Sequence, residues 1–125
     1  MGMTNITATD RLAIRRVIVR QLEAFRRDDP ETAFSLASPD IQAQFRTVKT
    51  FIATVRKSFE PLYRPRSVLF RDLTWMSDCP TQRVTVMSRD GRLLMAYYLM
   101  ERQTNGNWRI HGCELMPLSE ANRRS

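Results

Sequence analysis

The sequence has little of the material from which metal centres, disulfide frameworks and phosphate loops are built. It holds four glycines, two cysteines and one histidine in 125 residues. Such a composition excludes collagen-like repeats and disulfide frameworks, and no Gly-rich phosphate loop or zinc-finger spacing occurs. No apolar run approaches the length of a signal-peptide core or a membrane span. We therefore expect one bacterial, cytoplasmic domain with reduced thiols, no metal, no cofactor and no membrane partner.

Basic residues outnumber acidic ones, and nearly all of them are arginine. The formal net charge is +7, and Lys49 and Lys57 are the only two lysines among 20 basic residues. Because a basic surface attracts phosphate, a nucleic-acid-associated protein is one alternative. The arginines are dispersed, however, and the densest run is Arg64-Pro65-Arg66, with Arg71 beyond it. No basic and aromatic residues interleave as on a single-strand binding platform, which favours solvated helix faces.

The first half of the chain has the periodicity of amphipathic helices. Apolar residues three and four positions apart predict a helix over residues 9–27. Asp29-Pro30 and Ser38-Pro39 each place a capping residue before a proline, which predicts two short helices. A further helix is predicted over residues 48–62, with Pro61 in its last turn.

The second half has the pattern of antiparallel strands. Asp90-Gly91 and Asn105-Gly106 are interpreted as two-residue hairpin turns. Helices first and a meander after residue 65 predict an α+β fold, with the helices packed on one face of a curved sheet of about four strands. The domain is expected over residues 9–118, with flexible ends at 1–8 and 119–125. The strands are predicted over residues 67–76, 83–88, 93–102 and 108–116.

Two-residue turns fix the cross-strand partners and so which side chains share a face of the sheet. The predicted pairs include Val86 with Met95, Gln103 with Trp108, Leu99 with Gly112 and Tyr97 with Glu114. The face against the helices is then expected to carry Val84, Tyr97 and Trp108, and the opposite face an exposed apolar patch. A contiguous patch of this kind usually marks an interface, so we expect a homodimer. The interface is expected to comprise Met87, Leu94, Ala96, Tyr98, Met100, His111, Cys113 and Leu115. His111 has no obvious orienting carboxylate on that face, which favours a structural or interface role.

Three segments carry a resemblance to a known family: Asp28-Asp29-Pro30-Glu31-Thr32-Ala33-Phe34, Ala37-Ser38-Pro39-Asp40-Ile41-Gln42 and Gly106-Asn107-Trp108-Arg109-Ile110-His111-Gly112-Cys113-Glu114-Leu115. They resemble a small bacterial family of unknown function within the nuclear transport factor 2-like superfamily. The resemblance covers about residues 10–117. It implies a cystatin-like cone with a cavity between helices and sheet, and members that often dimerise through the sheet.

The resemblance does not carry a catalytic mechanism. The isomerases of the superfamily use a tyrosine on the first helix and carboxyl groups after the second helix and on a central strand. The corresponding places here hold Gln21, the segment 42–44 and Tyr97 or Tyr98, and none of them supplies a carboxylate. A glutamine cannot abstract a proton, so the isomerase mechanism is not expected.

Gln21 is an anomaly because it lies near the middle of the apolar face of the first helix. A buried amide needs a partner, so Gln21 either points into the cavity or is bonded within the core. Glu114, on the helix-facing side by the same register, either is a general acid or base with a raised pKa or reaches water or an Arg. The expected pocket residues are Gln21, Phe25, Phe34, Phe45, Phe59, Tyr97, Trp108 and Glu114.

Three functions follow from these observations. The preferred one is a non-catalytic homodimeric domain that binds a small apolar ligand or a partner protein in or beside the cavity. The second is a small lyase or isomerase that uses Glu114 as general acid or base. The third is the basic nucleic-acid-associated protein.

Overall fold

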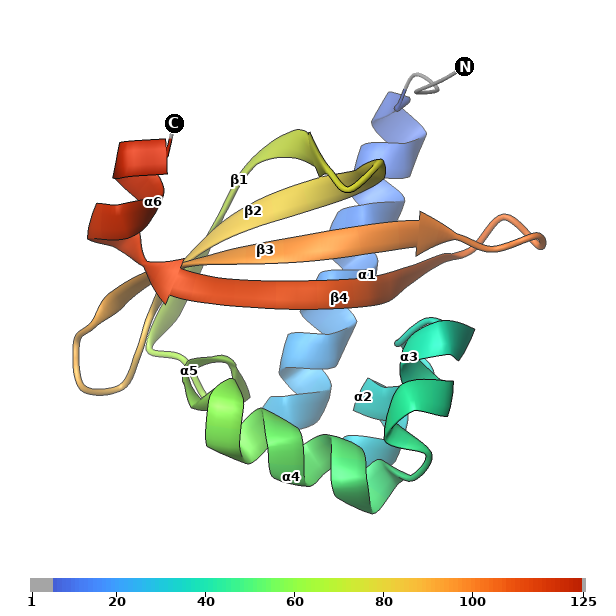
Figure 1. The fold of residues 1–125 in the computed structure, drawn as a ribbon, viewed down its shortest axis with the longest axis horizontal. Coiled ribbons are helices and arrows are strands. Elements are labelled where there is room, and N and C mark those ends of the chain that lie inside the picture. The colour runs from blue at the N-terminus through green and yellow to red at the C-terminus, as the bar shows by residue number, and fades with distance from the viewer. Residues whose placement is uncertain (1–5, 125) are drawn as a thin grey trace.

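The computed structural model describes residues 6–124, and the side chains of residues 6–121. A four-stranded antiparallel sheet in the order β1-β2-β3-β4 follows five helices, which confirms the predicted α+β fold. Figure 1 shows α1 crossing behind the sheet, with α2, α3 and α4 gathered beside β4. The elements are α1 (Ala8–Arg26), α2 (Pro30–Ser35), α3 (Pro39–Phe45), α4 (Val48–Ser58), α5 (Glu60–Tyr63), β1 (Ser67–Met76), β2 (Cys79–Met87), β3 (Leu93–Arg102), β4 (Trp108–Pro117) and α6 (Leu118–Arg124).

Capping residues start the helices. The Thr7 hydroxyl accepts a hydrogen bond from Asp10 N–H, and the Asp10 carboxylate accepts one from Thr7 N–H, both at 3.0 Å. This capping box starts α1 within the segment predicted to be flexible, of which residues 1–5 lie outside the described residues. The predicted helix over 48–62 is divided into α4 and α5 instead. Pro61 has no N–H to continue the helix, so the chain starts a new turn at Glu60.

The strand bounds largely agree with the prediction, but the β2–β3 register does not. Ser88 N–H donates to the Arg92 carbonyl at 2.9 Å, so the loop contains three residues and not two. Gly91 occupies its left-handed position with φ +89°, where a side chain would be strained. Val86 consequently pairs with Leu94, one residue away from the expected partner. This shift turns the side chains of β3 to the faces opposite to those predicted.

The predicted register of the β3–β4 hairpin is wrong at its turn for the same reason, and a β-bulge farther along restores it. Gln103 N–H donates to the Asn107 carbonyl at 2.7 Å, which again makes a three-residue loop. Farther along, a β-bulge inserts His111 as an extra residue in β4. The two shifts cancel, so Leu99 pairs with Gly112 as predicted, although Trp108 pairs with Arg102 and not with Gln103.

The helix-facing side of the sheet, including the start of β4, forms the main core with α1 and α5. Leu94, Ala96, Tyr98 and Met100 are all buried on this side. Their expected role in a dimer interface is therefore wrong, because the chain's own helices already cover them. Cys113 and Leu115 pack against the same core. The main core cluster comprises Ile14, Ile18, Leu62, Val84, Val86, Ala96, Tyr98, Met100, Trp108 and Ile110.

The opposite face of the sheet, which we call the outer face, is covered in part by α6. Ala121 is 2% exposed and packs with Met95 and Tyr97 of β3. Residues 119–124, expected to form a flexible tail, thus continue the fold as a helix, and residue 125 lies outside the described residues. Among the helices of the described chain, none combines the length and the apolar character that a membrane crossing requires.

Candidate functional site

A cavity of about 320 Å³ lies between α1, α3, α4, α5 and β4. The link between α2 and α3 closes one side of it by pairing with the edge of the sheet. Ile110 N–H donates to the Leu36 carbonyl at 2.9 Å, and Ser38 N–H donates to the Ile110 carbonyl at 2.8 Å. The cavity is lined by Gln21, Phe25, Ala37, Ile41, Gln44, Phe45, Phe51, Thr54, Val55, Phe59, Leu62, Ile110, Gly112 and Cys113.

Aromatic rings form the wall on the helical side. The ring centroid of Phe51 lies 5.6 Å from that of Phe45 in an edge-on arrangement and 5.1 Å from that of Phe34. Phe25 stacks on Phe51 at 6.3 Å and on Tyr63 at 5.7 Å. These spacings are those of favourable aromatic pairs. The wall is therefore held in place by its own packing, without a ligand.

Gln21 is 5% exposed and unites the two roles left open by the sequence. Its Nε2 donates to the Ala33 carbonyl at 3.2 Å, which ties α1 to α2. The same side chain lines the cavity. Within the described residues no donor reaches its Oε1, so this atom is available to accept a hydrogen bond from a ligand.

The described lining of the cavity carries no charge, because it includes no Asp, Glu, His, Lys or Arg. Burial raises the pKa of the Cys113 thiol far above its usual range, so the thiol is not ionised at neutral pH. Among the described residues, neither a charged general base nor a reactive thiolate therefore faces the cavity. Its chemistry is that of a neutral apolar binding site with Gln21, Gln44 and Thr54 as its polar groups.

The structure brings four of the eight predicted pocket residues to the cavity: Gln21, Phe25, Phe45 and Phe59. Phe34 lies behind the wall, against Phe51. Ile41, Phe51 and Thr54 were not predicted to line it. The apolar face of the helix predicted over 48–62 already contained Phe51, but nothing in the sequence distinguishes a cavity wall from a filled core.

Three predicted pocket residues lie elsewhere. Tyr97 and Glu114 pair with each other as expected but lie on the outer face, where Glu114 is exposed and Tyr97 packs against α6. Trp108 is buried near the start of α1, close to Asp10. Hydrogen bonds from Thr7 hold the pKa of that carboxyl below its usual range. The placement of Tyr97 and Glu114 is wrong because the β2–β3 loop is one residue longer than predicted, which reverses the faces of β3 and of the β4 residues paired with it beyond the bulge.

His111 lies at the bulge and not on an apolar interface. Its Nδ1 is 2.8 Å from the hydroxyl of Ser38, the buried N-cap of α3, and 3.7 Å from a carboxylate oxygen of Glu101. Asp40 joins them, with ligand atoms of Asp40, Glu101 and His111 all within 4.8 Å of one another. These three side chains could hold a divalent ion, a grouping that the sequence analysis missed because the bulge creates it.

The contact between Ser38 and His111 does not form a hydrolytic triad. A serine nucleophile and its orienting acid must bind opposite nitrogens of the imidazole. Here the hydroxyl and Glu101 both approach Nδ1, and Ser38 is 0% exposed. The hydroxyl also accepts a hydrogen bond from Ile41 N–H at 3.3 Å. The arrangement therefore fixes α3 on β4.

Comparisons with known proteins agree with the fold. A family model described as "Domain of unknown function (DUF4864)" matches residues 7–123. A protein of unknown function with a cystatin-like fold from Nostoc punctiforme is 14% identical, with a TM-score of 0.58 over 90% of this chain and 93% of that one. A structure from Catenulispora acidiphila is 13% identical, with a TM-score of 0.56 over 93% and 96%. No curated protein matches the chain.

Proposed function

The chain belongs to the DUF4864 family, and because that description names no activity, we propose from the cavity itself that the protein binds a small, neutral, largely apolar ligand. The observation that carries the proposal is an uncharged cavity of about 320 Å³ whose aromatic wall surrounds the buried Gln21 amide. Apolar walls with a few convergent polar groups are typical of small-molecule sites. The ligand that fits best has an apolar body and one hydrogen-bond donor for Gln21 Oε1.

The absence of ionisable groups from the described lining favours binding over catalysis. A lyase or isomerase needs a group that takes or gives a proton at the reacting atom. Glu114, the residue considered for that role, is exposed on the outer face, away from the cavity. The described residues around the cavity offer no replacement.

Native mass spectrometry of the purified protein tests the proposal. We expect a mass adduct that is released on denaturation, and binding of the neutral fluorophore N-phenyl-1-naphthylamine to protein freed of that adduct. Thr54→Trp should abolish both signals, because an indole at this half-buried position fills the cavity. Ala53→Trp is the matched control, because Ala53 is exposed on the same helix and does not line the cavity. An adduct or probe signal that Thr54→Trp leaves intact would contradict the proposal.

We also propose that the protein self-associates, through a surface that differs from the interface predicted from the sequence. Met87 does lie on the outer face, beside the exposed Leu93 and near Leu69, which are 46% and 58% exposed. These side chains favour a homodimer through the part of the outer face that α6 leaves open. Sedimentation equilibrium should then give twice the 14.6 kDa chain mass. Leu69→Arg with Leu93→Arg should restore the mass of one chain, and a wild-type monomer at tens of micromolar would contradict the dimer.

A further inference from the structure

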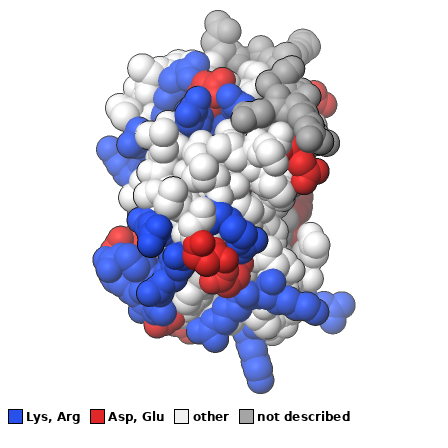
Figure 2. All heavy atoms as spheres, turned by 90° about the vertical axis from the view of Figure 1, so that its left-hand side faces the viewer, with Lys and Arg blue, Asp and Glu red and all other residues white. Residues whose placement is uncertain are grey.

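A second hollow lies on the other side of α1, between this helix, the start of β1 and the β2–β3 hairpin. It is an open groove of about 610 Å³, and it shares no lining residue with the cavity. The run Arg64-Pro65-Arg66, the densest basic segment of the sequence, forms its floor with Arg26 and Arg89 on either side. Figure 2 shows this side of the molecule, where basic side chains outnumber acidic ones over the lower half.

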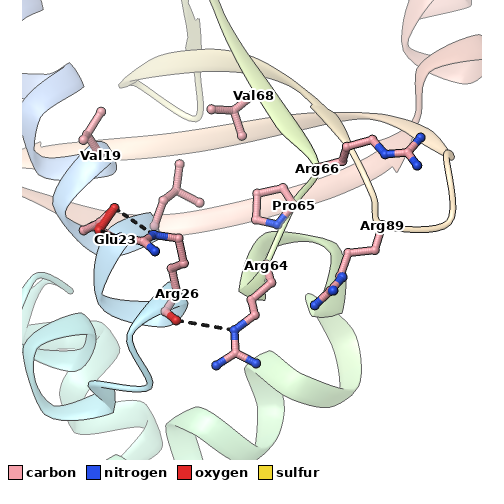
Figure 3. A pocket seen from close by; sticks show the side chains of 9 residues that line it. Val19, Glu23, Arg26, Arg64, Pro65, Arg66, Val68 and Arg89 are labelled. Carbon is pink, nitrogen blue, oxygen red and sulfur yellow. Dashed lines mark hydrogen bonds and ion pairs between the residues drawn. The ribbon is translucent and has the colours of Figure 1, made fainter.

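The arginines of the groove differ in how they are neutralised. Arg26 is paired with Glu23. Arg64 lies 2.5 Å from an Asp28 carboxylate oxygen and donates to the carbonyl of Arg26. Arg66 and Arg89 have no carboxylate partner in the described part of the chain, and the guanidinium of Arg66 lies 4.0 Å from the sulfur of Met87. Two arginines at the rim of the groove therefore carry a charge that no carboxylate of the described residues compensates, and the guanidinium of Arg66 points away from the valines (Figure 3).

Exposed aliphatic side chains adjoin these two charges. Val19 on α1 and Val68 on β1 are 45% and 37% exposed, and the half-buried Leu22 of α1 also lines the groove. Figure 3 shows the valines on one side of Pro65 and the side chains of Arg66 and Arg89 on the other. The groove thus has an apolar half and a cationic half.

We propose that this groove binds a single-chain anionic amphiphile. The side chains of Arg66 and Arg89, which are both exposed, turn onto its anionic head, a carboxylate or a phosphate monoester, and bind it through charge-assisted hydrogen bonds. Its alkyl chain lies on Val19, Leu22 and Val68 and removes them from water. The site is independent of the cavity, which is neutral and lies on the other side of α1.

The residues that line the groove favour an anionic amphiphile over a nucleic acid or an anionic membrane. A single-stranded nucleic acid needs aromatic faces on which its bases stack, and no aromatic side chain lines the described groove. An anionic membrane is flat at the scale of the protein, whereas here the apolar surface lies inside a hollow. The separated apolar and cationic halves match one molecule that carries a head and a tail.

Isothermal titration with decanoate and decyl phosphate, below the concentrations at which they form micelles, tests the proposal. We expect saturable binding at a ratio of one to one, at least tenfold tighter than that of 1-decanol and of decyltrimethylammonium. Acetate and inorganic phosphate should bind at least tenfold more weakly, because they lack the chain. Arg66→Glu with Arg89→Glu should weaken decanoate binding at least 100-fold, and Val68→Ser about fivefold.

Controls separate the groove from the cavity and from net charge. Arg16→Glu changes the charge at an exposed position of α1 outside the groove, so it should leave decanoate binding unchanged. Thr54→Trp, which fills the cavity, should also leave it unchanged. Arg66→Lys with Arg89→Lys keeps the charge without the planar guanidinium and should give an intermediate affinity.

Several results would overturn the proposal. One is decanol binding as tightly as decanoate, and another is unchanged decanoate binding in the doubly substituted glutamate variant when circular dichroism shows it folded. A third is that a thymidine oligonucleotide, or vesicles containing phosphatidylglycerol, bind the wild-type protein more tightly than decanoate does. In this case the doubly substituted glutamate variant would lose that binding while its affinity for decanoate is unchanged. The third result would assign the groove to a nucleic acid or to a membrane surface.

Discussion

The two hollows beside α1 differ in almost every physical property, although one helix separates them. The cavity is lined by rings and aliphatic chains without a charge, and the groove has four arginines and a glutamate around an apolar strip. Gln21 and Phe25, one turn apart, face the first, and Val19, Glu23 and Arg26 face the second. The difference teaches that the helical period alone assigns one side of α1 to packing and the other to charge. The same substitution should therefore have unequal effects on the two sides.

The largest difference is expected for apolar truncation. Phe25→Ala should lower the free energy of unfolding by about 3–5 kcal/mol, because it leaves a hole beneath the rings of Phe51 and Tyr63. Val19→Ala, on the groove side, should change it by no more than about 0.5 kcal/mol, since Val19 is 45% exposed. Urea denaturation measures both. Equal losses would show that the groove side is packed as tightly as the cavity side.

A smaller difference is expected for the polar groups of α1. Gln21→Leu should cost about 1 kcal/mol, because the Ala33 carbonyl then keeps only a weaker bond from Leu36 N–H at 3.3 Å. Glu23→Gln should have a smaller effect than Gln21→Leu, because the ion pair of Glu23 with Arg26 is exposed to solvent. Denaturation curves of the two variants should keep this order, and the reverse order would make the surface ion pair the stronger tie.

On the packed side of α1, a substitution of Tyr98 is expected to stabilise the protein and not to destabilise it. Its hydroxyl is buried without a hydrogen-bond partner among the described residues, and burial raises its pKa well above the usual value. Tyr98→Phe should raise the free energy of unfolding by about 1 kcal/mol, because the unpaired hydroxyl is removed while the ring stays. Thermal unfolding followed by circular dichroism measures it, with Tyr97→Phe as the control. A loss of stability would reveal a partner for the hydroxyl.

The smallest effect is expected from the charge of the groove. Arg89→Glu should raise the free energy of unfolding by about 0.3 kcal/mol at low salt, because it removes one cation from a cluster of four. The gain should vanish in 1 M salt, where the Debye length is about 3 Å. Parallel denaturation series at both salt concentrations check this, and a gain that persists in high salt cannot be electrostatic.

The sequence predicted the elements of the fold well and the faces of the sheet poorly. Caps such as Asp29 and Ser38 mark helix starts through local chemistry, and the structure confirms both. The faces of β3 depend on a single residue of loop length, and Asp90-Gly91 occurs in two-residue and three-residue hairpins alike. Half of the candidate pocket residues line the cavity because they lie on or directly beside helices, whose period does not depend on turns. Glu114 was misplaced because the face on which a strand residue lies does depend on the turns.

The three-residue loop and the bulge at His111 also give the β3–β4 hairpin two separate places where it can lose a residue. Deleting Thr104 would leave Asn105-Gly106 as a two-residue turn between the same paired residues. Deleting His111 would join Ile110 directly to Gly112, whose partners are already consecutive in β3, at the loss of the hydrogen bond to α3. Neither deletion changes which side chains of β4 face the core. Single changes of chain length at either place should therefore be accepted without repacking of the core.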